Sequence, residues 1–242
     1  MWSPFLDWVA AASDDFTMTA PTFIAAVPAQ DWWNPAFLEQ ISPSPVVVDG
    51  RPDAAQGNVW YAANINEVGW FIHGYESAWL PQELLQRQHE LSDALFAASR
   101  HWSVALHFNK GLAGANAKDV GAASDTAMHP AALTAFALVI IGGAGRPAYP
   151  HMTGGGPDLT AARNQARSIG MAMAELRTVA PRTGSYVAES NFFESDWQQA
   201  FWGPNYSRLR AVKAAYDPEG LFFVHHGVGS EDWSADGFTR LA

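Results

Sequence analysis

One run of alternating side chains constrains the fold more than any other feature of the sequence. In residues 102–109 large apolar side chains occupy every second position, and small or polar side chains stand between them. Such alternation predicts a β-strand with one apolar face. Longer helical patterns flank it at residues 81–98 and at residues 159–179, the second with Asp158 as its N-cap. Strands separated by long helices predict an α+β fold, in which an antiparallel β-sheet has helices packed on one face.

Shorter apolar runs predict further strands, with turn-forming residues between them. These runs are residues 16–19, 23–28, 46–48, 68–77, 185–187 and 221–224. Residues 130–141 fit either a helix or a strand, and their β-branched second half favours a strand from residue 138 onward. Residues 142–157 are rich in glycine and proline, so we expect a loop there.

Composition narrows the class of protein. The 242 residues carry a net charge of −10 and no lysine or arginine cluster, so the chain would repel a phosphate backbone and we expect no nucleic-acid partner. No run of 18 apolar residues is present, so we expect no membrane span. The chain has no cysteine and no recognisable signal peptide, which indicates a cytoplasmic protein without disulfides. Its 11 tryptophans are typical either of a large aromatic core or of an apolar pocket.

The region from residue 185 to residue 218 combines several local signals in a fixed order. A strand pattern at residues 185–187 precedes an aromatic turn, and a helical pattern then begins near Asn205. The helix must end at Asp217, because the residue before a proline, here Pro218, is displaced from the α region.

This order of signals resembles the C-terminal part of the berberine-bridge-enzyme-like FAD-linked oxidases, which are vanillyl-alcohol-oxidase-type flavoproteins. The positions in register with that family's pattern are Gly203, Asn205, Arg208, Leu209, Lys213, Tyr216, Asp217 and Pro218. One position departs from it, because Ala188 stands where the family has an asparagine two residues after its tyrosine. That difference removes one polar contact expected near the flavin.

The resemblance implies a flavin-dependent oxidoreductase. Such proteins bind FAD, pass a hydride from a small organic substrate to the flavin, and return the electrons to dioxygen or another acceptor. The resemblance implies that Tyr186 is a catalytic residue that also reaches the flavin, and that Asn205 contacts the cofactor. The structural alternatives are a buried tyrosine and a helix N-cap, respectively.

The resemblance also implies a division of the chain. Residues 1–184 would form the substrate-binding domain, and residues 185–242 would form the berberine-bridge-type C-terminal segment. The FAD-binding domain that precedes this region in the family is not recognisable in the sequence. We therefore expect that domain to lie on a missing or separate polypeptide, and we expect the chain to be incomplete alone.

Four residues are candidates for contact with a small-molecule substrate. His107 and Asn109 point to the same face of the strand expected at residues 102–109, and Lys110 follows at its end. Tyr75 is expected to share a face with His73 on the preceding strand. Each of these side chains also has an ordinary structural role as its alternative.

Two adjacent histidines, His225 and His226, follow the run at residues 221–224. In a regular strand they would point to opposite sides and could not face one site. We therefore expect no metal site.

A second function stays open on sequence grounds. The aromatic residues would also suit a non-catalytic α+β module that holds a small apolar ligand without flavin. Bound flavin distinguishes the two hypotheses.

Overall fold

The structure is a computed structural model that describes residues 3–12, 28–31, 34–41, 46–55, 58–64, 69–108, 112, 115–149 and 155–241. The chain divides into two compact units, Met1–Glu67 and Val68–Ala242. None of the described helices is long and apolar enough to cross a lipid bilayer.

The first unit consists of short helices and one β-hairpin. Its elements are α1 (Ser3–Ala11), η1 (Ala29–Asp31), α2 (Pro35–Ile41), β1 (Val46–Val48), β2 (Val59–Tyr61) and η2 (Ala62–Asn64). The Asp49 carboxylate holds the hairpin connection, since it accepts hydrogen bonds from Arg51 and from Asn58 Nδ2 at 2.7 Å. The strand expected at residues 46–48 is confirmed. The strands expected at residues 16–19 and 23–28 fall almost entirely outside the described residues.

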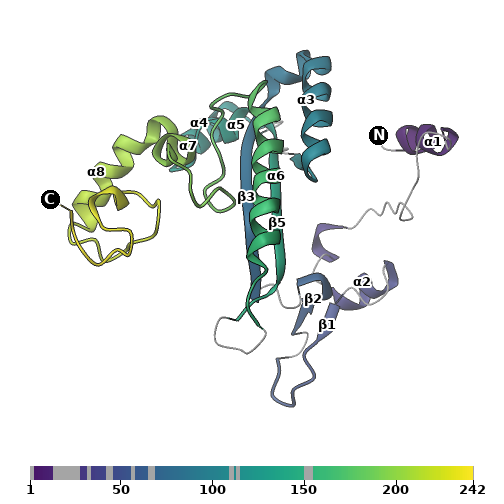
Figure 1. The fold of residues 1–242 in the computed structure, drawn as a ribbon, viewed down its shortest axis with the longest axis horizontal. Helices are drawn as coiled ribbons and strands as arrows, with labels where there is room; N and C mark the ends of the chain where they lie inside the picture. The colour runs from purple at the N-terminus through teal and green to yellow at the C-terminus, as the bar shows by residue number, and fades with distance from the viewer. Residues whose placement is uncertain are drawn as a thin grey trace. The chain divides into compact units, whose positions relative to one another are not determined.

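The second unit is built on a three-stranded antiparallel sheet with the order β3-β5-β4. Figure 1 labels β3 and β5 of this sheet. The strands are β3 (Trp70–Pro81), β4 (Ala105–Phe108) and β5 (Ala135–Pro147). The helices that precede the C-terminal region are η4 (Gln82–Gln86), α3 (Gln88–His101), α4 (Ala117–Ser124), α5 (Ala131–Thr134) and α6 (Leu159–Arg177). The long helices α3 and α6 lie against one face of the sheet and form the main core with it. The predicted α+β fold is therefore confirmed.

Helix α6 approaches the sheet closely because glycines replace side chains where it crosses. A Cβ atom on Gly74 would lie 3.3 Å from the Cα atom of Ala166. A Cβ atom on Gly143 would lie 2.9 Å from the Trp102 ring and 3.2 Å from Ile169 Cδ1. The α6 helix begins at Asp158, whose side chain accepts a hydrogen bond from the Ala161 N–H at 2.9 Å, as its N-cap pattern predicts.

The loop expected at residues 142–157 is wrong over its first six residues, which continue strand β5. Their glycines make room for bulky neighbours on both faces of the sheet, so they serve the strand rather than a turn. The Tyr75 ring lies within 2.9 Å of the position of a Gly142 Cβ atom, and Trp102 Nε1 donates a 2.9 Å hydrogen bond to the Gly142 carbonyl. That tryptophan lies outside β4, which begins only at Ala105.

The C-terminal region is helical, and none of its described residues between 185 and 229 forms a strand. Its elements there are α7 (Trp197–Trp202), η5 (Gly203–Asn205) and α8 (Tyr206–Tyr216), with η6 (Ser230–Asp232) after them. The strands expected at residues 185–187 and 221–224 are therefore wrong. After α8 the Asp217 carboxylate accepts the backbone N–H groups of Leu221 at 2.8 Å and Phe222 at 3.0 Å, which a strand would need for its ladder. The division between residues 1–184 and 185–242 stays a prediction.

Candidate functional site

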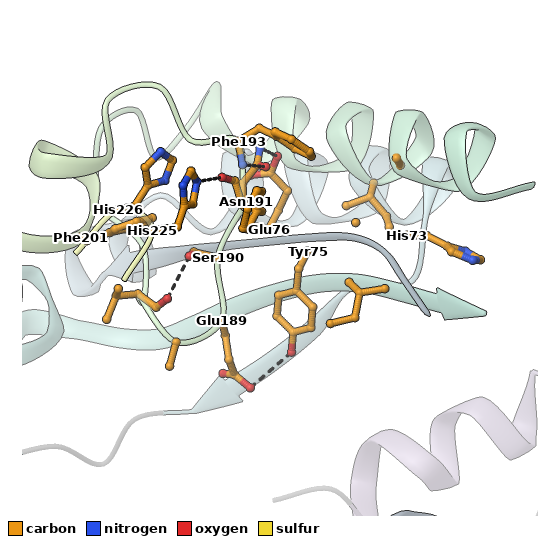
Figure 2. Close-up of a pocket in the computed structure, with 17 residues that line it drawn as sticks. His73, Tyr75, Glu76, Glu189, Ser190, Asn191, Phe193, Phe201, His225 and His226 are labelled. Atoms are coloured by element: carbon orange, nitrogen blue, oxygen red, sulfur yellow. Dashed lines mark hydrogen bonds between the residues drawn. The ribbon is translucent and has the colours of Figure 1, made fainter. Parts of the chain in front are cut away.

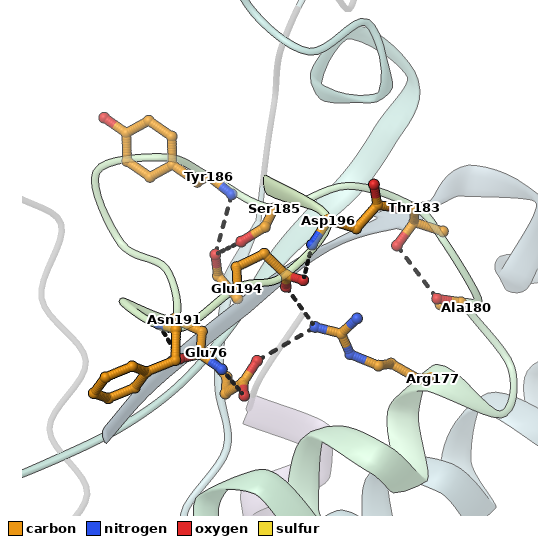
Figure 3. A network of polar contacts seen from close by, with 11 residues as sticks. Glu76, Arg177, Ala180, Thr183, Ser185, Tyr186, Asn191, Glu194 and Asp196 are labelled. Carbon is orange, nitrogen blue, oxygen red and sulfur yellow. Dashed lines mark hydrogen bonds and ion pairs between the residues drawn. The ribbon is translucent and has the colours of Figure 1, made fainter. Parts of the chain in front are cut away.

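Residues 184–189 run antiparallel to β3 along its outer edge and are held there mostly by side chains. Trp79 donates its backbone N–H to the Gly184 carbonyl at 3.2 Å. The hydroxyl groups of Ser77 and Ser185, both buried, lie 2.8 Å apart. Ser77 Oγ also accepts the backbone N–H of Tyr186 at 3.1 Å (Figure 3). A serine hydroxyl thus replaces the carbonyl that a β-ladder would supply, which explains why residues 185–187 form no strand.

A half-buried carboxylate, Glu76, holds the next part of this segment. It accepts hydrogen bonds from Asn191 Nδ2 at 3.0 Å and from the Arg177 guanidinium at 3.3 Å (Figure 3). Arg177 also lies 3.7 Å from the carboxylate of Glu194. Burial raises the pKa of Glu76, and the Arg177 charge opposes that rise only in part. The network fixes the segment to the end of α6.

Between β3, α6 and this segment lies an open cavity of about 820 Å³. Its wall is apolar and aromatic, with a few polar groups, as in many small-molecule sites (Figure 2). The residues that line it are Ile72, His73, Gly74, Tyr75, Glu76, Ala166, Ile169, Val187, Ala188, Glu189, Ser190, Asn191, Phe192, Phe193, Phe201, His225 and His226.

Tyr75 and Glu189 form a polar pair on the cavity wall. The Tyr75 hydroxyl donates to Glu189 Oε1 at 3.3 Å (Figure 2). Burial raises the pKa of Tyr75, and the Glu189 charge raises it further. Tyr75 therefore remains a neutral hydrogen-bond donor well above neutral pH, and it orients the Glu189 carboxylate.

Two histidines close the cavity from the C-terminal side. The rings of His225 and His226 are stacked with 3.7 Å between their centroids, and Phe192 stacks on His225 at 4.1 Å. His225 Nε2 also lies 2.8 Å from the Phe192 carbonyl oxygen. His226 has a left-handed backbone, with φ at 56°. The expectation that these rings face opposite sides is therefore wrong, because residues 225–226 form a turn rather than a strand.

The comparisons with known proteins concern this same segment. Residues 185–229 match the family described as "Berberine and berberine like". These residues, 185–229, are called the berberine-like segment below. Every described wall residue of the cavity from Val187 to His226 lies inside the matched range.

Relatives of known sequence extend this match. The chain is 50% identical over 56 residues to FAD-linked oxidoreductase notD′ of Aspergillus versicolor. That match covers 23% of this chain and 9% of that protein. The chain is 36% identical over 120 residues to FAD-linked oxidoreductase notD of Aspergillus sp. (strain MF297-2). That match covers 48% of this chain and 18% of that protein. The chain thus spans less than a fifth of the length of these relatives.

A solved structure agrees with the fold. The VAO-type flavoprotein MtVAO713 from Myceliophthora thermophila C1 superposes with a TM-score of 0.51 over 66% of this chain and 27% of that one, at 23% identity. Together with the berberine-like segment, this likeness confirms the resemblance to a berberine-like, VAO-type flavoprotein.

The sheet brings three of the expected site residues to one face, opposite α3 and α6. Trp79 on β3, Leu138 on β5 and His107 on β4 are aligned across the sheet, and Tyr75 lies on the same face as Trp79. The Tyr186 ring of the berberine-like segment lies 6.1 Å from the Trp79 ring. Tyr75 also lines the cavity, whereas Tyr186 stands next to it and points away from the Glu76 network (Figure 3).

A bulge separates Tyr75 from His73, which were expected to share a face. The register of β3 against β5 shifts between Ile72 and Gly74. His73 consequently turns toward α6, where its Nδ1 lies 2.7 Å from Gln165 Oε1. That expectation is wrong for this reason, although both side chains reach the cavity wall.

The other expected residues lie away from the cavity or outside the described residues. Asn205 of the berberine-like segment donates its side-chain amide to the carbonyls of Met128 at 2.7 Å and Thr126 at 3.2 Å. It thus ties the start of α8 to a distant loop, and its contact with a cofactor stays a prediction. Asn109 and Lys110 lie outside the described residues.

The sequence interpretation missed the two carboxylates of the site. A signal existed for Glu76, because it is the only carboxylate in residues 70–81, most of which are apolar. No local pattern marks Glu189, whose position depends on how the berberine-like segment lies along β3.

Proposed function

We propose that this chain is part of an FAD-dependent oxidoreductase, to which it contributes a substrate-binding domain and the berberine-like segment. One observation carries the proposal: the berberine-like segment and strand β3 together build a single aromatic cavity. The relatives named FAD-linked oxidoreductases support it. An FAD-binding domain, on the same or a separate polypeptide, would complete the flavin site.

The cavity fits one end of FAD and not the other. Aromatic rings such as Phe192 and Phe193 offer surfaces on which a flat isoalloxazine ring can pack. A pyrophosphate needs lysine or arginine side chains, or the N-terminus of a helix. Among the described residues the cavity wall has neither. The FAD-binding domain would therefore hold the pyrophosphate.

The reaction would take place where Tyr75 joins the cavity to the sheet face that carries His107 and Tyr186. FAD, when bound, would supply the acceptor of a hydride from a small organic substrate, and dioxygen or another acceptor would reoxidise it. Tyr186, in its phenolate form, would accept the substrate proton, since its ring is partly exposed and its backbone is fixed by Ser77. Tyr75 and His107 would position the substrate on this face, together with Asn109 and Lys110, which follow β4 in the sequence.

A spectroscopic experiment tests the proposal. The full chain is produced alone and together with a separate FAD-binding domain of a berberine-like flavoprotein, and each preparation is examined for the visible absorbance band of bound flavin. A yellow complex that oxidises substrate, and that loses turnover but keeps flavin in the Tyr186→Phe variant, supports the proposal. Colourless protein in both preparations, with tight binding of an apolar ligand, would favour the non-catalytic module.

A further inference from the structure

The ring of His129 lies between two glycines, Gly184 just before the berberine-like segment and Gly203 within it. A Cβ atom on Gly184 would lie 2.8 Å from His129 Nε2, and one on Gly203 would lie 2.7 Å from it. Both glycines have left-handed backbones, with φ at 79° and 54°, which other residues rarely adopt. A side chain at either position would displace the ring, so the backbone here packs directly on the imidazole.

The loop that carries His129, residues 125–130 between α4 and α5, is attached to the berberine-like segment at two further points. Asn205 donates its side-chain amide to two carbonyl groups of the loop. Arg208 of α8 pairs with Asp125, although both side chains are exposed and such pairs contribute little to stability. Of these contact residues, only His129 has a side chain that changes its charge near neutral pH.

The hydrogen bonding of the ring requires its neutral form. His129 Nδ1 accepts the backbone N–H of Ala131 at 3.1 Å, so the proton of the neutral ring is on Nε2. Nε2 is buried and has no hydrogen-bond partner among the described residues. A second proton would have to bind Nδ1, where it would face the Ala131 N–H. Protonation therefore breaks this hydrogen bond and places a charge between two glycine backbones.

The surroundings of the ring do not compensate that charge. Burial lowers the pKa of His129, and the Gln199 backbone opposes this change only in part. These are the two causes of the shift, so the charged side chains of the surrounding elements do not stabilise the protonated ring. Those side chains are Asp125 and Arg208, which pair with each other, Arg182 before Gly184, and Asp196 at the start of α7.

We infer that His129 makes the attachment of the berberine-like segment dependent on pH: the neutral ring holds the segment against the loop at residues 125–130, and the protonated ring releases it. A histidine whose pKa is lowered by folding contributes stability above its unfolded pKa, and that contribution is lost as pH falls through the folded pKa. The inference goes beyond the proposed function. It needs neither flavin nor substrate, so it can be tested on the full chain alone.

Hydrogen exchange tests the inference. Exchange of the backbone amides is measured by mass spectrometry at about pH 7.5 and about pH 5.5, each relative to an unstructured peptide at the same pH. We expect the protection of α7 and α8 to fall about tenfold at the lower pH, which is the scale of one hydrogen bond lost at a buried group. The protection of α3, which belongs to the main core, should change much less.

A matched pair of variants locates the effect. His129→Asn keeps a side-chain oxygen that can accept the Ala131 N–H but does not titrate, so the protection of α7 and α8 should change less than about twofold with pH. His89→Asn, at an exposed position of α3, should respond as the natural chain does. An unaltered response in His129→Asn, no response in the natural chain, or an equal loss of protection in α3 and α8 would each overturn the inference.

The protonation state of the ring gives a second measurement, which needs no variant. In NMR spectra of the ring nitrogens, we expect His129 of the natural chain to carry its proton on Nε2 at neutral pH and to titrate below pH 6.5. A proton on Nδ1 at neutral pH, or a midpoint at or above 6.5, would overturn the inference even if His129→Asn failed to fold.

Discussion

At the scale of single residues, one buried hydroxyl joins the sheet to the berberine-like segment. Ser77 Oγ contacts both the Ser185 hydroxyl and the Tyr186 backbone N–H. These contacts join strand β3 to the start of the berberine-like segment. Buried polar groups are costly when they lose a partner, since water cannot replace it. The position of Tyr186 therefore depends on a side chain more than 100 residues earlier in the sequence.

Substitution of Ser77 by alanine tests this dependence. Ser77→Ala leaves the Ser185 hydroxyl and the Tyr186 N–H without their partner, so we expect a loss of about 1–3 kcal/mol in the free energy of unfolding. Urea denaturation measures it. Ser92→Ala, on the exposed side of α3, is the control and should change stability by less than about 0.5 kcal/mol. Equal effects of the two substitutions would contradict the structural role of Ser77.

Glu76 gives the stability a specific dependence on pH. Its pKa in the folded chain lies above the ordinary value of 4.5, chiefly because of burial. A carboxyl group with a raised pKa favours folding when it is protonated. Its contribution is thus fully present below the unfolded pKa and is lost as pH rises through the folded pKa.

The Glu76→Gln variant isolates this contribution, because glutamine does not titrate. We expect the free energy of unfolding of the natural chain, minus that of the variant, to fall as pH rises from below 4.5 toward neutrality. Denaturation curves over a pH series measure it. A difference that rises with pH would instead show that Arg177 outweighs burial and lowers the pKa of Glu76.

At the scale of elements, the sequence predicted those parts of the fold whose pattern is local. The alternation at residues 105–108, the Asp158 cap and the helix that follows it need no distant partner, and all three are present. Two strands failed because distant or neighbouring side chains take the N–H groups of a ladder, Ser77 for Tyr186 and Asp217 for Leu221 and Phe222. The glycines of β5 predicted a loop, because glycine is common in turns. The bulky side chains for which they make room are distant in the sequence and come close only in the folded chain.

The same reasoning explains what could be predicted of the site. Tyr75 and His107 were assigned to a strand face, because strand periodicity fixes the side to which each residue points, and their contact with a substrate stays a prediction. Glu189 and the stacked His225 and His226 were not, because they lie on turns whose course is set by contacts with β3 and Phe192. Residues in turns become site residues only through tertiary structure.

The close packing of α6 on the sheet predicts an effect of a single methyl group. In Gly143→Ala the new Cβ atom would lie 2.9 Å from the Trp102 ring, which a hydrogen bond to Gly142 holds in place. We expect a loss of about 1–3 kcal/mol in unfolding free energy, measured by urea denaturation. Gly121→Ala in α4, where nothing lies within 4 Å of the new atom, should instead be neutral or stabilising. Comparable stability of the two variants would contradict the close packing around Gly143.

At the scale of the whole molecule, the chain combines an aromatic cavity, a net negative charge and the berberine-like segment. A net charge of −10 favours cationic ligands over anionic ones at long range. Many large apolar side chains of the berberine-like segment are exposed, among them Phe193, Tyr216, Leu221 and Phe222. Such a surface is typical of a protein–protein contact, as an FAD-binding domain would provide.

Reconstitution with an FAD-binding domain is the decisive test of the proposed function. The measurement is the flavin content, by visible absorbance, of the complex between this chain and a separate FAD-binding domain of a berberine-like flavoprotein, compared with each part alone. We predict that the two parts co-purify, that the complex retains FAD after desalting, and that substrate oxidation requires both. Two parts that fold separately but neither associate nor retain flavin together would refute the proposed function.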